Sequence, residues 1–302
     1  MKKFLTKLLI FILILLSYFG FNILLNKIII SRSNIPLKDI NILIAGDSHT
    51  RKALDPSFFN SAQNISHDAE PYYVTYWKLK YIIEKVNVDT LILGFCHHNF
   101  AASFNDKKLC AKNWASEMFR IIYPLRDIRT VDNIEIDYVE FCKVYFRNMC
   151  LFPKKDHFHF FKDYTNSNRS NVLNFDVPIQ EHFYKYKEDG WFSDIALCYL
   201  DSIIGLCRNN KIELILVASP EHKEYNKRVP KPIMDKFIFE QEKLRKQGLL
   251  MIDLSEDFYP DDYYFNTDHL NQKGASKFSS EVAEIIRSRG QKTETGIEKQ
   301  VE

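Results

Sequence analysis

The stretch that decides the fold is Asn41-Ile42-Leu43-Ile44-Ala45-Gly46-Asp47-Ser48. Its short apolar run is typical of a strand that is buried on both faces. Gly46, which has no side chain, permits a sharp turn and lets the backbone approach a substrate closely. A serine at the exit of such a strand presents its hydroxyl at the carboxyl edge of the sheet, with its own N–H available to a developing oxyanion. The stretch therefore indicates a nucleophilic serine on an α/β sheet.

Three further apolar runs have the same character, and helical patterns separate them. The runs are Thr90–Phe95, Glu213–Ala218 and Leu249–Leu254. The helical patterns cover Pro56–Ala62, Tyr73–Val86, Asp194–Asn209, Pro232–Gln247 and Gln272–Arg289. Strands that alternate with helices predict an α/β fold in which a parallel sheet is covered by helices on both faces.

A second motif, Asn266-Thr267-Asp268-His269, precedes the last helical pattern and supplies a base for the serine. In open parallel sheets, ligands bind beyond the carboxyl ends of the strands. The segments His97-His98-Asn99 and Ser219-Pro220-Glu221-His222 also follow strands, so we expect all these groups to converge on one edge. Ser48 and His269 should then lie within ~2.6–3.5 Å of each other.

Together these motifs resemble the SGNH (GDSL-type) hydrolase family, over roughly residues 41–288. The resemblance implies the three-layer, flavodoxin-like parallel sheet of that family. It also implies that Ser48 is the nucleophile, that His269 is the general base, and that the Ser48 N–H and Asn99 form the oxyanion hole.

The sequence departs from the family pattern in two places. The segment Asn60–Ser66, where the family supplies an oxyanion-hole glycine, contains no glycine. Asn266 stands three residues before the histidine, where the family has its aspartate. Asp268 is the favoured replacement, because a carboxylate stabilises an imidazolium better than a neutral amide does. The alternatives are that Asn266 orients His269, that Asp268 caps the last helix, or that the site is a Ser48/His269 dyad.

The N-terminus predicts a membrane anchor. Residues 8–25 are almost wholly apolar and uncharged, and with Phe4 and Leu5 the run is long enough to span a bilayer. Lys2, Lys3 and Lys7 precede it, which favours a cytoplasmic N-terminus and an exported body. Residues 1–33 are thus expected to form a cytoplasmic tip and a single signal anchor in the bacterial cytoplasmic (inner) membrane. A cleaved signal peptide is the alternative, but no small-x-small cleavage site follows the run.

The stretch of about residues 100–192 breaks the alternation and is rich in aromatic and charged residues. We expect a largely helical insertion that shapes a substrate pocket. His157 and His159 have the spacing of a metal-binding pair, but they lack further ligands at convincing spacing, so a loop with aromatic anchors is the favoured interpretation. Residues 289–302 are polar and aperiodic, and predict a disordered tail.

Composition excludes some classes of function. With 41 basic and 39 acidic residues the chain is nearly neutral, which argues against a nucleic-acid partner. The six cysteines contain no Cys-x-x-Cys pair, so a zinc ribbon is not indicated, and no metal or organic cofactor is expected. In an oxidising compartment, Cys142 with Cys150 and Cys198 with Cys207 are the sequence-local candidates for disulfides, with buried free thiols as the alternative.

The sequence-based interpretation is a membrane-anchored serine esterase or O-acyltransferase. The acyl group is most simply an O-linked acetyl. The resemblance and the anchor indicate an acylated envelope or capsular carbohydrate as substrate, and polysaccharide-modification machinery as a partner. Two alternatives stay open. One is a non-catalytic binding or scaffold component of such machinery, and the other is a doubly wound domain whose Gly-Asp-Ser is fortuitous.

Overall fold

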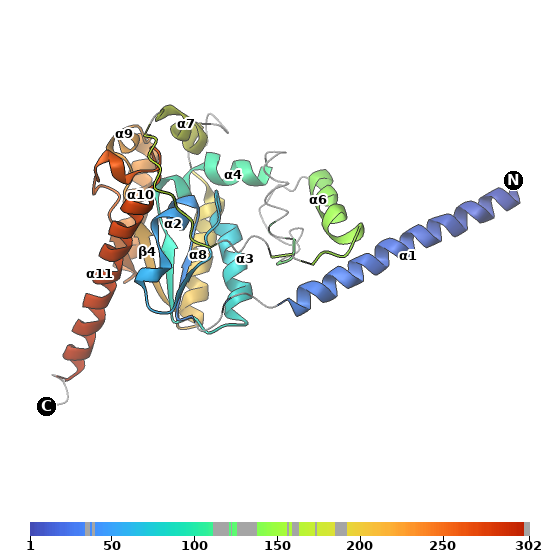
Figure 1. Ribbon diagram of the computed structural model, residues 1–302, viewed down its shortest axis with the longest axis horizontal. Helices are drawn as coiled ribbons and strands as arrows, with labels where there is room; N and C mark the ends of the chain where they lie inside the picture. Colours follow the sequence, from blue (N-terminus) through green and yellow to red (C-terminus); the bar gives the residue numbers. More distant parts are fainter. Residues whose placement is uncertain are drawn as a thin grey trace. The chain divides into compact units, whose positions relative to one another are not determined.

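The computed structural model describes residues 1–33, 37, 40–110, 121, 123–125, 138–155, 157–158, 163–172, 174–184 and 192–298. The chain divides into two compact units (Figure 1). One comprises Met1–Pro36 and Lys108–Phe160, and the other comprises Leu37–Lys107 and Phe161–Glu302. His159, residues 299–302 and parts of the predicted insertion lie outside the described residues.

The second unit is built on a five-stranded parallel sheet, whose strand order is β2-β1-β3-β4-β5. The strands are β1 (Ile42–Ala45), β2 (Ala62–Asn64), β3 (Thr90–Gly94), β4 (Glu213–Ala218) and β5 (Leu250–Asp253). This is the flavodoxin-like order, so the predicted α/β class and its three layers are confirmed.

Strand β2 is the one strand that the sequence analysis did not predict. Instead of a helix over Pro56–Ala62, the chain forms a single 3-10 turn, η1 (Pro56–Phe58), and then enters the sheet at its edge. An edge strand of three residues that pairs only with β1 needs no apolar alternation to form, so its sequence carries no periodic signal.

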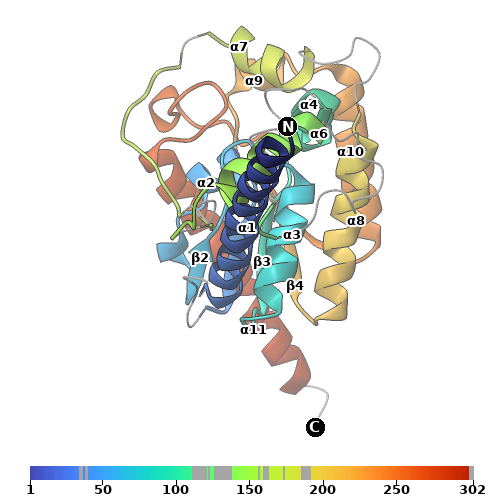
Figure 2. The same cartoon turned by 90° about the vertical axis from the view of Figure 1, so that its right-hand side faces the viewer.

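Helices cover both faces of the sheet, as Figures 1 and 2 show. Helices α2 (Ser48–Ala53) and α11 (Gln272–Glu298) pack together on one face. Helices α3 (Tyr72–Ile83) and α8 (Asp194–Asn209) lie side by side on the other, and α10 (Lys231–Lys246) packs against β5. On the α2/α11 side, Ile44, Ile92 and Ile215 stand in register across three strands and form one core with Phe278 of α11.

The predicted helices over Tyr73–Val86, Asp194–Asn209 and Pro232–Gln247 correspond closely to α3, α8 and α10. Helix α11 begins at Gln272, as predicted, but it continues to Glu298 into the stretch predicted to be a disordered tail. A polar segment can extend a helix because its backbone hydrogen bonds form within the segment itself. The absence of apolar periodicity predicts only that such an extension lacks a packed face.

The described part of the insertion contains several short helices, which belong to both units, whereas residues 151–155, 157–158 and 163–172 form no helix. The helices are η2 (His97–Phe100), α4 (Ala102–Cys110), α6 (Tyr138–Tyr145), the π-helix η4 (Phe146–Cys150), α7 (Asp176–Ile179) and the π-helix η5 (Gln180–Tyr184). Two further short elements, α9 (Lys223–Asn226) and η6 (Asp261–Tyr263), follow β4 and β5. Within the second unit, Phe104, Ile179, Phe183 and Tyr225 share a small apolar core.

In the first unit, α1 (Lys2–Arg32) is long and apolar enough to cross a membrane. Two buried asparagines interrupt its apolar surface. Asn22 Nδ2 donates to Cys150 O at 3.0 Å, and Asn26 Nδ2 donates to Met149 O at 2.9 Å. Asn26 Oδ1 also lies 3.0 Å from Nε2 of the buried His157, so this histidine has a hydrogen-bonding role within the unit.

The cysteines of the predicted local pairs are free thiols. Cys142 and Cys198 are exposed, whereas Cys150 and Cys207 are buried. The disulfide pairs Cys142–Cys150 and Cys198–Cys207 are therefore not formed in this structure.

Candidate active site

The turn after β1 places Ser48 at the carboxyl edge of the sheet. Asp47 is the N-cap of α2, because its Oδ1 accepts a hydrogen bond from the His49 N–H at 3.0 Å. Ser48 is the first residue of the helix, a position whose N–H has no partner inside the helix. The hydroxyl and the backbone N–H of Ser48 thus lie together at the carboxyl edge of the sheet.

Gly46 has a packing role that the sequence analysis did not predict. Its φ of +154° disfavours any side chain, and a Cβ there would meet the side chain of Thr50. A Cβ at Gly94, at the end of β3, would meet the same Thr50 side chain. The two glycines therefore make room for α2 against β1 and β3, which gives a packing reason for the glycine at position 46.

Ser48 Oγ lies 2.8 Å from His269 Nε2, within the distance expected from the sequence. His269 is held in a tight loop, in which Tyr264 and Leu270 form an antiparallel bridge and Phe265 N donates to His269 O at 2.8 Å. Ser48 and His269 are both half-buried, whereas their neighbours Asp47, His49 and Asp268 are buried. A substrate can therefore reach this pair of side chains, while the groups behind it are screened from water.

Asn266 makes the hydrogen bond that orients the imidazole. Its Oδ1 accepts from the His269 backbone N–H at 2.9 Å and lies 3.0 Å from His269 Nδ1. Because a backbone N–H only donates, the Asn266 atom that faces it is the oxygen. The same oxygen then requires a proton on Nδ1, which leaves Nε2 free to accept from Ser48. An amide in this position thus selects the tautomer that a general base needs.

Asp268, the residue favoured from the sequence, contributes a charge rather than this hydrogen bond. Its Oδ1 lies 3.3 Å from His269 Nδ1, and its Oδ2 lies 3.5 Å from His49 Nε2. Burial acts to raise the Asp268 pKa, but the neighbouring His269 outweighs it and holds that pKa well below its ordinary range. Burial also lowers the pKa of His269, against the opposing charge of Asp268. The imidazole is therefore neutral near pH 7, as a base must be.

Asn99, the predicted oxyanion-hole residue, is fixed by hydrogen bonds on both sides of its amide. Its Oδ1 accepts from Cys96 N at 2.8 Å, and its Nδ2 donates to Asp47 Oδ2 at 2.8 Å. An amide nitrogen carries two hydrogens, and Asn99 Nδ2 also lies 3.4 Å from His98 Nε2. The turn that holds Ser48 and the turn that holds Asn99 are thus joined through Asp47.

The expected convergence of strand-end residues on one edge is confirmed, and it brings in groups that the sequence analysis did not assign. His98 Nε2 lies 2.6 Å from Asp47 Oδ2, and His97 Nε2 lies 2.6 Å from Glu221 Oε2. His49 Nδ1 lies 3.3 Å from Glu221 Oε1. His49 is the second residue of α2 and is buried. The available signal was positional, since each of these residues follows a strand.

His222, which belongs to one of the segments expected at this edge, is buried. Its Nδ1 accepts from Glu224 N at 3.2 Å, which caps α9, and its Nε2 lies 3.1 Å from Asp261 Oδ1. The insertion contributes one more histidine, because the ring of His182 in η5 stacks on that of His98 at a centroid distance of 4.8 Å.

The buried charges of this cluster are strongly coupled. Burial would lower the pKa of His49, but Asp268 and then Cys96 and Glu221 outweigh it and raise that pKa well above its ordinary value. Burial lowers the pKa of His98 to about 4. Burial would raise the pKa of Glu221, yet its histidine neighbours hold it far below the ordinary range.

Two groups of these side chains bring potential metal ligands together, although no cofactor is expected from the sequence. His49, Cys96, His98 and Glu221 form one group, and His49, His182 and Asp268 form the other. Within each group, the ligand atoms lie within 4.8 Å of one another.

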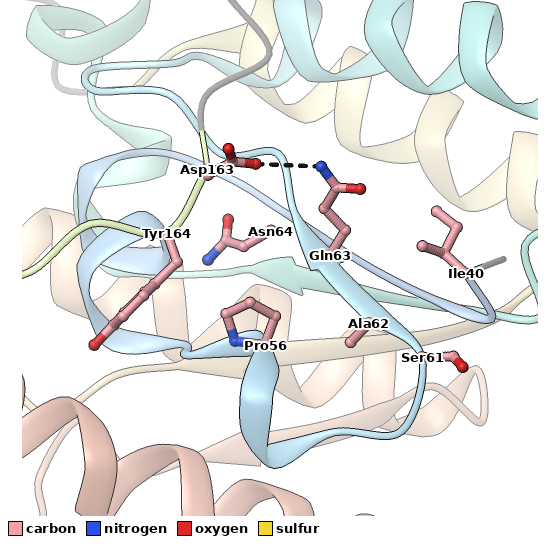
Figure 3. A pocket seen from close by; sticks show the side chains of 8 residues that line it. All are labelled: Ile40, Pro56, Ser61, Ala62, Gln63, Asn64, Asp163 and Tyr164. Atoms are coloured by element: carbon pink, nitrogen blue, oxygen red, sulfur yellow. Dashed lines mark hydrogen bonds between the residues drawn. The ribbon is translucent and has the colours of Figure 1, made fainter. Parts of the chain in front are cut away.

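A pocket of about 440 Å³ lies along the edge strand β2, and none of the predicted site residues lines it (Figure 3). Gln63 donates to Asp163 Oδ1 at 3.2 Å on its wall. This pocket is therefore distinct from the Ser48 site.

Comparison with known proteins gives structural likenesses at low sequence identity. A family model whose description states no function matches residues 147–291. No curated protein matches the sequence. A GDSL-like lipase from Bacteroides thetaiotaomicron is similar in structure, with 10% identity, a TM-score of 0.42, and coverage of 86% of this chain and 94% of that one.

Two other solved structures have comparable similarity. One is described as an acylhydrolase from Bacteroides fragilis, with 11% identity, a TM-score of 0.41, and coverage of 85% of this chain and 92% of that one. The other is described as a platelet activating factor from Streptococcus pneumoniae, with 13% identity, a TM-score of 0.40, and coverage of 92% and 98%.

Proposed function

We propose that this chain is an SGNH-type serine esterase or O-acyltransferase that acts on acyl groups, most simply O-acetyl, of an envelope carbohydrate. The observation that carries the proposal is the 2.8 Å contact between Ser48 Oγ and His269 Nε2. A serine hydroxyl is a weak nucleophile until a base within hydrogen-bond reach accepts its proton. Here the base is neutral, half-buried, and oriented by Asn266.

In the proposed first step, Ser48 Oγ attacks the ester carbonyl while its proton passes to His269 Nε2. The Ser48 N–H and the Asn99 side-chain amide stabilise the oxyanion. Asp268 stabilises the imidazolium that forms, because its carboxylate is 3.3 Å from Nδ1. His269 then protonates the departing sugar oxygen, which leaves an acyl group on Ser48.

The second step decides between a hydrolase and a transferase. His269 removes a proton from water, or from the hydroxyl of an acceptor sugar, and that oxygen attacks the acyl-enzyme. Ser48 then regains its proton and the acyl group leaves as an acid or as a new ester. A membrane anchor at α1 supports an envelope substrate, since it would hold the site near glycans outside the cytoplasm.

A fluorophosphonate probe tests the catalytic part of the proposal. The full-length chain, purified in detergent, should be labelled at one site, and Ser48→Ala should abolish the labelling. Ser57→Ala is a matched control, because Ser57 is an exposed serine of η1 in the same unit. Labelling that persists in Ser48→Ala would contradict the proposal.

The main alternative is a non-catalytic binding or scaffold component of a polysaccharide-modifying complex. The absence of a glycine from Asn60–Ser66, where the family has an oxyanion donor, favours it. A folded chain that neither reacts with the probe nor cleaves an aryl acetate would support this alternative over the enzyme.

A further inference from the structure

Behind Ser48, four side chains of types that bind transition metals converge in a fully buried space. His49 follows β1, Cys96 and His98 follow β3, and Glu221 follows β4. One ligand atom from each lies within 4.8 Å of the other three. Two imidazoles, a thiol and a carboxylate are among the ligands that Zn²⁺ takes in tetrahedral sites.

The polar atoms that face this space lack hydrogen-bond partners. Among the described residues, His49 Nδ1, His98 Nδ1 and Glu221 Oε1 are buried without a hydrogen bond. Buried polar groups without partners are rare and costly, so each one requires an explanation.

Their distances show that these atoms approach one another without aligning as donors and acceptors. Glu221 Oε1 lies 3.3 Å from His49 Nδ1 and 3.9 Å from His98 Nδ1. The ligand atoms of one cation point at a shared centre and not at each other. Such ligand atoms therefore lie close together without hydrogen bonds between them.

The outward-facing atoms of the same side chains are well supported. His98 Nε2 lies 2.6 Å from Asp47 Oδ2, and Glu221 Oε2 lies 2.6 Å from His97 Nε2. His49 Nε2 faces Asp268 Oδ2 at 3.5 Å. A carboxylate behind a ligating histidine is the usual means by which proteins fix the tautomer and the orientation of the ring.

We propose that His49, Cys96, His98 and Glu221 bind one divalent transition-metal ion, with Zn²⁺ the best match. A dication with one thiolate and one carboxylate has no net charge, which suits a fully buried position. Cys96 binds the metal as a thiolate, so its thiol proton is displaced to solvent when the ion arrives. Four protein ligands leave no open position, which is typical of a structural zinc site.

The role of such an ion follows from where its ligands stand in the chain. His49 adjoins Ser48, and Cys96 and His98 precede Asn99 in η2. The metal would tie the ends of three strands together and hold the nucleophile turn against the oxyanion turn. This inference does not depend on ester chemistry, because metal binding is measured by itself.

The test is the metal content of the full-length chain, purified in detergent and dialysed against metal-free buffer. Elemental analysis should find about one zinc per chain. Replacement of the metal by Co²⁺ should give a near-ultraviolet thiolate-to-cobalt absorption band. Cys96→Ser should remove that band, and Cys198→Ser, which removes an exposed thiol on α8, should keep it.

A second variant tests the same site in case Cys96→Ser does not fold. Glu221→Gln keeps the size of the side chain but removes one charged ligand, and it should weaken metal retention on dialysis against a chelator. A parent chain that is folded, contains no metal and does not take up Co²⁺ would overturn the proposal. The cluster would then be a network in which a protonated His49 bridges Glu221 and Asp268.

Discussion

At the scale of single residues, the proposed mechanism divides the work of one catalytic carboxylate between two side chains. Asn266 contributes the hydrogen bond to His269 Nδ1, and Asp268 contributes the nearby charge. An asparagine in place of a triad aspartate is damaging when its NH₂ group faces the ring, because the wrong tautomer results. Here the backbone N–H of His269 holds the oxygen of Asn266 in place, so the useful tautomer is kept.

This division predicts the ranking of substitutions at the two positions. Asn266→Ala should lower kcat for a model aryl ester by about 10²-fold or more, because the ring loses its tautomer and its anchor. Asn266→Asp should keep the activity or increase it, since it adds a carboxylate at the same place. Steady-state hydrolysis of an aryl acetate by the detergent-solubilised chain measures both. If Asn266→Ala is as active as the parent while Asp268→Ala is inactive, Asp268 alone orients the base.

Asn99 allows a second test at this scale. Asn99→Ala should reduce kcat by about 10²–10³-fold with a smaller change in KM, because the oxyanion exists only during the reaction. Asn105→Ala is the control: Asn105 Nδ2 donates to Asn99 O at 2.8 Å and supports the same turn without reaching the substrate. Equal losses in the two variants would assign Asn99 to structural support of η2.

At the scale of elements, the sequence predicted the strands and helices that have a clear apolar pattern. The runs that became β1, β3, β4 and β5 are apolar because helices cover both faces of these strands. Strand β2 was missed because Ala62-Gln63-Asn64 is short and polar, and because its pairing with β1 depends on residues elsewhere in the chain.

The loop after β2 depends on a buried ion pair that no local pattern reveals. Lys78 of α3 is fully buried, with Nζ 2.7 Å from Glu70 Oε2 and 2.5 Å from Ile65 O. Thr75 Oγ1 donates to the other oxygen of Glu70 at 2.7 Å. These contacts fix Ile65, which directly follows β2, against α3.

Lys78→Met should therefore destabilise the fold by about 3–5 kcal/mol, because it leaves the Glu70 carboxylate buried without its partner. Lys80→Met, two residues further along α3 at an exposed position, should change stability by less than about 0.5 kcal/mol. Urea denaturation of the detergent-solubilised variants measures the difference. A small effect of Lys78→Met would show that Glu70 is readily protonated or reached by water.

At the scale of the whole molecule, the sequence could predict that the site lies at the carboxyl edge of the sheet, but not how its side chains pair. Ser48 and His269 were named in advance from motifs expected at the carboxyl edge of the sheet, and Asn99 from the resemblance to SGNH hydrolases. The pairing of His98 with Asp47 and of His49 with Glu221 depends on side-chain directions across different strand ends. Sequence spacing does not encode these directions, so the buried cluster emerged only from the structure.

The lysines beside the apolar span predict the orientation of the chain in the membrane. Lys2, Lys3 and Lys7 precede the apolar span, so the positive-inside tendency places them in the cytoplasm and the sheet-containing unit outside. Cys198 is an exposed thiol on α8 of that unit and reports its side of the membrane. In a variant with Cys110 and Cys142 changed to serine, a membrane-impermeant maleimide should label intact spheroplasts as fully as lysed ones. Cys96, Cys150 and Cys207 are buried and should stay unreactive, and adding Cys198→Ser should abolish the signal. Labelling only after lysis would place the unit in the cytoplasm, and an envelope carbohydrate could not then be its substrate, even if Ser48 is an active nucleophile.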